Sequence, residues 1–269
     1  MSMAETREYN PTLFLAEGVG PDTVTPPDLL ILNQPITDFS VFSRLWRHTN
    51  YRICADGGAN RLYDMFDNGV AAARRDDYLP DTIHGDLDSL RDDVRDYYAG
   101  HGVEISQDHD QYSTDFGKTM QKISSKHPSN RQREILVLGT LGGRVDQGLG
   151  LLHEIIREEN RDPRLRLWLF SERSLSFILR ATRNVIRGTS PNGLFTENVG
   201  IVPIYGPAVI TTSGLEWDVK DWPTQMGYQV STSNHAKEEE IIVQTNAPVL
   251  FTIERKELPL AGRLRKRST

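Results

Sequence analysis

Apolar and polar positions follow two different patterns along this chain, and the change comes near residue 180. Up to that point, short apolar runs that predict strands are separated by stretches with the apolar spacing of amphipathic helices. We expect strands at 29–32, 51–55, 82–83, 103–105, 135–138 and 165–170, and helices at 39–48, 61–66, 94–98, 116–123 and 145–156. Strands and helices in alternation are typical of a parallel sheet covered by helices on both faces.

Beyond residue 183 the helical pattern fades and short β-rich runs replace it. They lie at 200–205, 209–212, 229–233, 241–245 and 249–253, with Gly, Pro and Asn between them. A spacing of about ten residues predicts a small antiparallel sandwich. The predicted fold class is therefore α/β, with an N-terminal parallel-sheet α/β domain over 28–182 followed by a C-terminal all-β sandwich domain over 183–256. Residues 1–27 are polar and contain several prolines, which predicts a flexible N-terminal arm, and 257–269 form a basic tail.

Composition narrows the possible partners. A formal net charge of −6 argues against a general nucleic-acid coat, because phosphate backbones select basic surfaces. No apolar run reaches the roughly 20 residues that span a bilayer, so we expect neither nucleic acid nor membrane as a partner. The single cysteine, Cys54, excludes an intramolecular disulfide, and no secretory signal pattern opens the chain. These features favour a cytoplasmic protein. We interpret the basic tail as solvated, with a localisation or anion-binding patch as the alternative.

Four segments place aspartate beside glycine or hydroxyl residues where expected strands end. They are 55–60 (ADGGAN), 84–89 (HGDLDS), 110–116 (DQYSTDF) and 142–147 (GGRVDQ). In an α/β sheet the carboxyl ends of neighbouring strands open onto one crevice, so all four segments are expected at the same edge. Aspartate and asparagine at such turns also cap helices, and capping remains the alternative for any one segment taken alone.

The second of these segments predicts a metal site. Asp86 and Asp88 are two residues apart, so in an extended chain they project to the same side. Two close carboxylates repel each other unless a cation or a proton lies between them. Mg²⁺ is the natural candidate, because it binds through one or two carboxylates together with substrate phosphates. Asp115 and Asp56 are expected to add a further ligand or a water bridge.

Positive and aromatic side chains suggest the rest of a binding site. Arg144 and Lys118 are candidates to neutralise phosphate charge, although an exposed helix charge is an equal alternative for Lys118. In the β-rich half, Trp217 stands beside the hydroxyl-rich segments 211–213 and 231–234. An aromatic in this setting can hold a flat cationic ligand by stacking and cation–π attraction, and a core tryptophan is the alternative.

At these residues the chain resembles a known family, the eukaryotic-type thiamin pyrophosphokinases. The matching pieces, in family order, are CADGGANRL at 54–62, GDLDS at 85–89, DQ at 110–111 with STDF at 113–116, GGRVDQ at 142–147, TT at 211–212, GL at 214–215, Trp217 and VSTSN at 230–234. The resemblance implies the transfer of diphosphate from ATP to thiamin, with Mg²⁺, giving AMP and thiamin diphosphate. It also implies a homodimer whose active sites lie between the α/β domain of one subunit and the sandwich of the other. Segments 71–78 and 183–198 look like expanded loops against the family pattern.

The resemblance and the residue chemistry together give each candidate a role. Asp86, Asp88 and Asp115 are assigned to Mg²⁺ binding, with Asp56 as a weaker candidate, and Arg144 and Lys118 are assigned to phosphate. Gly57, Gly58, Asn60 and Arg61 are expected to shape the nucleotide side of the site, Gln111 and Asp146 to orient thiamin, and Thr114 and Gln147 to bind substrate. Trp217, Ser233 and Asn234, supplied by the partner subunit, are expected to hold the thiamin rings. Asp146 or Asp115 is the candidate base, and a metal-activated alcohol needs none. The alternative functions are a non-catalytic sensor that binds nucleotide or thiamin, and a kinase that moves only the γ-phosphoryl group.

Overall fold

The structure, a computed structural model, describes residues 6–18, 26–67, 72–126, 132–189 and 193–259. Its centre is a ten-stranded sheet with strand order β13-β10-β15-β8-β7-β6-β2-β3-β4-β5. The parallel part consists of β5 (Glu104–Gln107), β4 (Thr82–Gly85), β3 (Arg52–Ala55), β2 (Asp28–Ile31), β6 (Arg133–Leu138) and β7 (Leu165–Phe170). The antiparallel part consists of β8 (Ser174–Leu179), β15 (Val249–Arg255), β10 (Phe195–Val202) and β13 (Ser231–His235).

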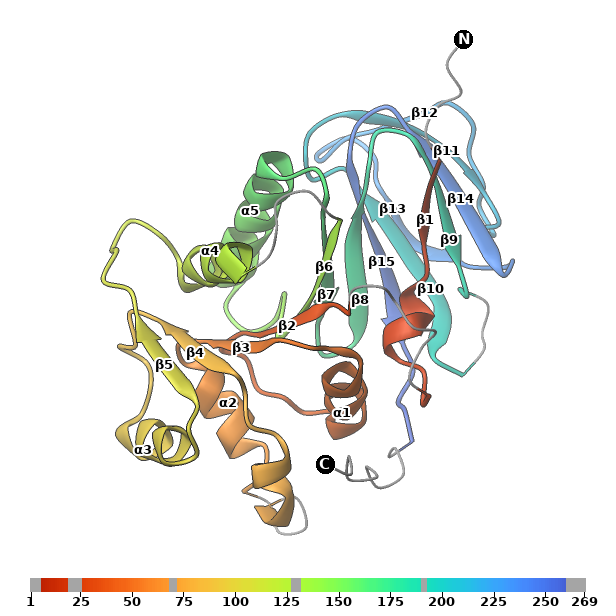
Figure 1. Cartoon of the computed structure of the whole chain (residues 1–269). Helices are drawn as coiled ribbons and strands as arrows, with labels where there is room; N and C mark the ends of the chain where they lie inside the picture. The colour runs from red at the N-terminus through yellow and green to blue at the C-terminus, as the bar shows by residue number, and fades with distance from the viewer. Residues whose placement is uncertain (1–5, 19–25, 68–71, 127–131, 190–192, 260–269) are drawn as a thin grey trace.

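Helices cover both faces of the parallel strands (Figure 1). One face carries α1 (Phe39–His48), α2 (Gly58–Asp64) and α3 (Asp92–Gly100), and the other carries α4 (Asp115–Lys126) and α5 (Val145–Arg161). The strands alternate accordingly: Leu29 and Ile31 pack in the core cluster beneath α1, whereas Leu30 packs in the cluster beneath α4. The predicted parallel α/β arrangement is therefore confirmed.

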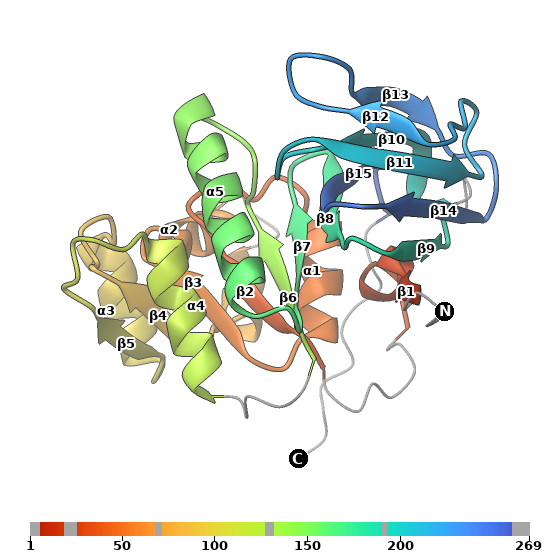
Figure 2. The same cartoon turned by 90° about the horizontal axis from the view of Figure 1, so that it is seen from above.

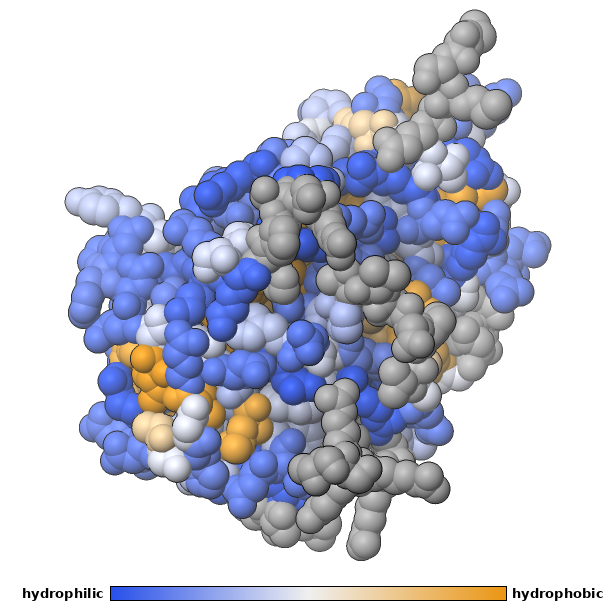
Figure 3. Space-filling model, viewed as in Figure 1, coloured by the Kyte–Doolittle hydropathy of each residue, from blue (hydrophilic) through white to orange (hydrophobic). Residues whose placement is uncertain are grey.

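A second sheet packs on the antiparallel strands and completes a sandwich (Figure 2). Its order is β1 (Thr6–Tyr9), β9 (Arg183–Arg187), β14 (Glu240–Thr245), β11 (Ala208–Ser213) and β12 (Trp222–Thr224). Ile186, Ile210 and Val243 from this sheet share one buried cluster with Phe177 and Phe251 of the ten-stranded sheet. The face seen in Figure 3 is largely hydrophilic with limited apolar areas, as expected when apolar side chains fill the space between the layers.

The prediction of a flexible arm over 1–27 is wrong for residues 6–18. β1 pairs in parallel with β9, and the 3₁₀ helix η1 (Pro11–Phe14) follows it. Tyr9 is buried, its hydroxyl donates to the carbonyl of Ile178 at 3.2 Å, and its ring stacks on Phe177 at 5.1 Å. The segment is polar at its start, but Phe14 and Leu15 of its short apolar run are buried in the core as well. Residues 1–5 and 19–25 lie outside the described ranges.

Two further boundaries differ from the prediction. The sandwich takes β1 and β8 from outside 183–256, and the central sheet runs without a break between the two predicted domains. The division at 182/183 itself stays a prediction. The expected loop at 183–198 is wrong where it forms β9 and the start of β10. In the other expected loop, 71–78, the structure has a short 3₁₀ helix, η2 (Ala72–Asp77), and residue 71 is not described. Most of the basic tail, 260–269, also falls outside the description.

Candidate active site

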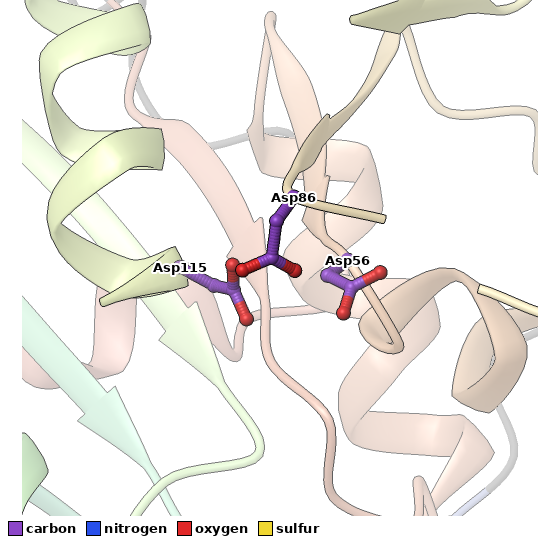
Figure 4. A group of neighbouring side chains, drawn as sticks. All are labelled: Asp56, Asp86 and Asp115. Atoms are coloured by element: carbon purple, nitrogen blue, oxygen red, sulfur yellow. The ribbon is translucent and has the colours of Figure 1, made fainter. Parts of the chain in front are cut away.

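Three predicted aspartates converge at the carboxyl ends of β3 and β4. Asp56 follows β3, Asp86 follows β4, and Asp115 is the first residue of α4. Each offers a carboxylate oxygen, and these oxygens all lie within 4.8 Å of one another (Figure 4). Gly85 makes this possible, since a Cβ at this position would lie 2.9 Å from both the Asp115 Oδ1 and the Asp56 Cβ. The side chains of Asp56, Asp86 and Asp115 therefore lie together at the sheet edge where acidic residues were predicted to converge.

Lys118 lies against this cluster and is almost completely buried. Its side chain is 1% exposed, and its Nζ donates to the Asp86 Oδ2 at 3.0 Å and lies 3.9 Å from the Asp115 Oδ1. Although burial acts against its charge, contact with Asp86 raises the pKa of Lys118, which therefore stays an ammonium. The alternative of an exposed helix charge is wrong, because α4 turns this side chain toward the sheet.

The three carboxyl groups have different electrostatic surroundings. Burial, together with the charge of Asp115, raises the pKa of Asp56 to about 6. Burial and the charge of Asp86 likewise raise the pKa of Asp115. Burial also disfavours the charged form of Asp86, but the hydrogen bond and charge of Lys118, together with a hydrogen bond from the Asp88 amide, hold the pKa of Asp86 below its usual range. The cluster thus carries more negative charge than one lysine can balance.

The donor set fits a hard divalent cation. Among the described residues, the Asp56 Oδ1 and the Asp115 Oδ1 are buried without a hydrogen-bond partner, and buried carboxylate oxygens are normally paired. Oxygen ligands from a few carboxylates are what Mg²⁺ prefers. Asp88 lies outside the group of three and accepts a hydrogen bond from the Ser89 hydroxyl at 3.0 Å, so its role as a fourth ligand stays a prediction.

A cavity of about 460 Å³ opens beside the carboxylates. Of the predicted site residues, it is lined by Asp86, Thr114, Asp115, Asp146 and Gln147. Apolar side chains from α4, α5 and the β6–α5 loop form its walls, among them Phe116, Leu141 and Leu151. The cavity therefore combines one acidic end with apolar walls, a composition suited to a ligand with a flat ring that is either cationic or carries phosphate held through a divalent cation.

Arg144 and Asp146 form a forked ion pair at the start of α5. Arg144 donates from Nε to the Asp146 Oδ1 at 3.1 Å and from Nη2 to the Asp146 Oδ2 at 2.6 Å. Both side chains are exposed, and this hydrogen bonding lowers the pKa of Asp146. Asp146 is therefore a weak proton acceptor as long as the pair is intact.

The candidates on α2 do not line the cavity. A Cβ at Gly58 would lie 2.3 Å from the carbonyl oxygen of Ile31, so this glycine lets α2 pack against β2. Gly57 similarly leaves room for the Asn33 side chain, and Arg61 donates to the Asn33 Oδ1 at 2.7 Å. Asn60 bridges the turn after β4: its Nδ2 donates to the Ser89 carbonyl at 2.7 Å, and its Oδ1 accepts from the Arg91 amide at 3.1 Å. Through these contacts, Gly57, Gly58, Asn60 and Arg61 hold the neighbouring loops of the site in place. Direct contact of these residues with a nucleotide stays a prediction.

The sandwich candidates also lie away from this cavity within one chain. Trp217 is 54% exposed, so the alternative of a core tryptophan is wrong. Buried Asn234 holds its backbone, accepting from the Trp217 amide at 3.2 Å and donating to the Trp217 carbonyl at 3.0 Å. Ser233 is exposed beside it. Gln111, in the loop before α4, is exposed and does not line the cavity either.

Three polar residues that line the cavity lie outside the motifs that marked the site in the sequence. Asn33 and Gln34 follow β2 at the same sheet edge but carry neither the aspartate nor the glycine that marked the other turns. Glu154 lies on α5 and forms an ion pair with Arg157 at 2.7 Å. Its spacing from Gln147 is seven residues, or about two helical turns, which is a signal that could have found it.

Comparison with known proteins decides the family. The family model "Thiamin pyrophosphokinase, catalytic domain" matches residues 42–168, and "Thiamin pyrophosphokinase, vitamin B1 binding domain" matches residues 184–250. This chain belongs to the thiamin pyrophosphokinase family. "Thiamine pyrophosphokinase 1" of Arabidopsis thaliana is 40% identical over 242 residues, which cover 87% of this chain and 88% of the relative.

Solved structures of the family agree with the fold. The thiamin pyrophosphokinase from Candida albicans superposes with a TM-score of 0.81 at 27% identity, covering 93% of each chain. The yeast thiamin pyrophosphokinase gives a TM-score of 0.83 at 27% identity, covering 93% of this chain and 91% of its own. The predicted family is confirmed. Separately, none of the helices in the described ranges has the length and apolarity needed to cross a membrane.

Proposed function

We propose that this protein is a thiamin diphosphokinase, which transfers the diphosphoryl group of ATP to the hydroxyl of thiamin and gives thiamin diphosphate and AMP. The observation that carries the proposal is the convergence of Asp56, Asp86 and Asp115 beside a cavity with apolar walls. Family membership supports it, because the relatives carry the name of this activity.

Asp56, Asp86 and Asp115 would hold Mg²⁺, with Asp88 as a nearby fourth carboxylate. The ion would supply charge neutralisation for the phosphate oxygens of ATP. Lys118 fixes the Asp86 carboxylate from the protein side, since its Nζ is held at 3.0 Å in a buried position. Transfers of this kind depend chiefly on positioning and charge balance, and the buried lysine supplies both.

The other candidates act on the substrates. Arg144 is exposed and can exchange its partner Asp146 for a phosphate, which a guanidinium binds in the same two-pronged manner. Asp146 and Gln147 line the cavity and orient thiamin. We assign no separate base, because Asp115 serves as a metal ligand and the pKa of Asp146 is lowered by its pairing with Arg144.

A homodimer would complete the site. Within one chain, Trp217 stays on the sandwich surface and does not line the cavity, so we assign the thiamin rings to the partner subunit's Trp217. Val145 and Leu149, one turn apart on α5 and next in sequence to residues that line the cavity, are 77% and 63% exposed. An apolar pair so exposed favours a second chain covering this part of α5. The cytoplasmic location expected from the sequence stays a prediction.

The test is a product assay on the purified protein with ATP, thiamin and Mg²⁺. We expect AMP to form only when thiamin is present, and to disappear when Mg²⁺ is chelated. Release of ADP would instead indicate transfer of the γ-phosphoryl group alone. Binding of both ligands without any nucleotide product would indicate the sensor.

A further inference from the structure

Gln34 runs along the glycine-rich loop between β6 and α5. Its Cβ lies 3.2 Å from an ideal Cβ at Gly139, and its Oε1 and Nε2 lie 2.8 and 2.9 Å from an ideal Cβ at Gly143. The backbone is fixed as well, because the Gln34 amide donates to the Leu32 carbonyl at 2.8 Å. Because Gly139 and Gly143 have no side chains, the Gln34 side chain can lie against the loop backbone, and its carboxamide lines the cavity.

This carboxamide is available to a ligand. Within the described ranges it makes no hydrogen bond to the protein. Nearby asparagines are engaged: Asn60 and Asn234 each use both ends of the amide on backbone groups, and the Asn33 Oδ1 accepts from Arg61. Gln147 also lines the cavity, but its side chain is exposed on α5, whereas Gln34 is half-buried. A glutamine offers an acceptor oxygen next to a donor nitrogen, so Gln34 presents an unused donor–acceptor pair to the cavity.

The surroundings limit what that pair can recognise. Leu32, Phe116, Leu141 and Leu151 give the cavity apolar walls that suit an aromatic ring. A glutamine carboxamide pairs in two-pronged fashion with a ring edge that carries an amino group next to a ring nitrogen, as it does with adenine. A neutral carboxamide is also suited to a neutral ring edge, whereas the carboxylates at the other end of the cavity suit cations.

We infer that Gln34 is a specificity-determining residue. Its carboxamide forms two hydrogen bonds with an aromatic ring bound in the cavity, one to an amino group of the ring and one to the adjacent ring nitrogen. The inference rests on the proposed function for the two rings of this chemistry, the adenine of ATP and the aminopyrimidine of thiamin. It is carried by the position of the Gln34 carboxamide, which has no hydrogen-bond partner among the described residues, lies against Gly143 and lines a cavity with apolar walls.

The experiment compares Gln34→Met, which keeps the length of the side chain, with wild type. Calorimetry in the presence of Mg²⁺ measures the dissociation constants of two ligand pairs: ATP with purine riboside triphosphate, and thiamin with its analogue that lacks the pyrimidine amino group. Gln121→Met is the matched control, because Gln121 is exposed on α4 and does not line the cavity. Calorimetry needs no turnover, so the readout does not depend on catalysis.

We expect wild type and Gln121→Met to bind one amino-bearing ligand about ten-fold more tightly than its partner lacking the amino group. In Gln34→Met this preference falls to about one, while the other pair keeps its wild-type ratio. The ligand pair whose affinity ratio falls to about one identifies the ring that Gln34 contacts. Two results would overturn the inference directly: equal affinities within both pairs in wild type, or unchanged affinity ratios in a folded Gln34→Met protein. An equal loss of affinity for all four ligands would also overturn it, because it would show that Gln34 only supports the loop structure.

Failure of this inference and failure of the proposed function look different. A wild-type protein that binds the ligands but forms no AMP contradicts the proposed function and leaves the ratio test valid. A wild-type protein that forms AMP while Gln34→Met keeps every ratio contradicts the inference alone. Wild type that binds none of the four ligands contradicts both.

Discussion

Asp86→Asn separates the chemical role of the acidic cluster from its role in stability. Asp86 accepts a hydrogen bond from the Lys118 Nζ at 3.0 Å, and Lys118 is 1% exposed. A hydrogen bond to a charged group contributes about 1.5–3 kcal/mol. The asparagine oxygen can still accept that bond, and the loss of one negative charge relieves repulsion with Asp56 and Asp115. We therefore expect the ion-free protein to lose no more than about 2 kcal/mol of its free energy of unfolding.

Activity should fall much further. Removing one of three charged ligands is expected to lower kcat/KM by about 100-fold or more, which corresponds to about 2.7 kcal/mol of transition-state stabilisation. A domain typically has about 5–15 kcal/mol of stability, so the variant stays folded and unfolding cannot explain the loss. Thiamin-dependent AMP release measures activity, and urea unfolding with a chelator present measures stability.

Asp96→Asn is the matched control, because Asp96 is exposed on α3, away from the carboxylate cluster. It should behave as wild type in both assays. An Asp86→Asn protein that keeps at least half of the wild-type kcat/KM, or whose activity falls only as far as its folded fraction does, would refute a metal-binding role for Asp86.

Four further outcomes are expected. Because the pKa of Asp56 is raised to about 6 and the ion must displace its proton, Mg²⁺ affinity should be constant above pH 6 and fall by about ten-fold per pH unit below it, as measured by calorimetry; a flat profile contradicts this. Trp217→Ala should raise the KM for thiamin and leave the KM for ATP nearly unchanged, and steady-state kinetics would contradict the stacking role if both stayed the same. Tyr9→Ala should lower the free energy of unfolding by about 3 kcal/mol, whereas a truly loose segment would show no change in urea unfolding. At a thiamin concentration well below the raised KM of Trp217→Ala, mixing that variant with Asp86→Asn should give more activity than the sum of the two alone, and no such gain argues against sites shared between subunits.

The elements that the sequence predicts well are those whose own residues carry the signal. Helix α1 spans residues Phe39–His48 as expected, because its apolar residues repeat at helical spacing and Asp38 caps it through the Val41 amide at 3.0 Å. The acidic cluster was partly predictable for a similar reason: Asp56 and Asp86 directly follow parallel strands that share one edge, and Asp115 begins the helix after the next strand. The sequence ranked Asp88 above Asp56, whereas the structure groups Asp56 with Asp86 and Asp115, because that choice depends on how the turns pack.

Other features depend on partners that are distant in sequence. Strand β1 exists because β9 offers it an edge, and nothing in residues 6–9 signals that pairing. The continuity of the central sheet through β8 is likewise a property of the assembled fold. Gly58 and Asn60 were assigned to the nucleotide from their motif, yet their contacts are with Ile31 and Ser89. A motif identifies which residues matter, whereas the packing shows what each one contacts.

The central claim is that Asp56, Asp86 and Asp115 jointly bind the divalent cation that accompanies ATP. The most direct measurement is an anomalous difference map from crystals grown with Mn²⁺ and a non-hydrolysable ATP analogue. We predict one strong peak within bonding distance of oxygens from these carboxylates, next to the analogue's phosphates. A peak elsewhere, with the analogue bound and these carboxylates free of metal, would contradict the account.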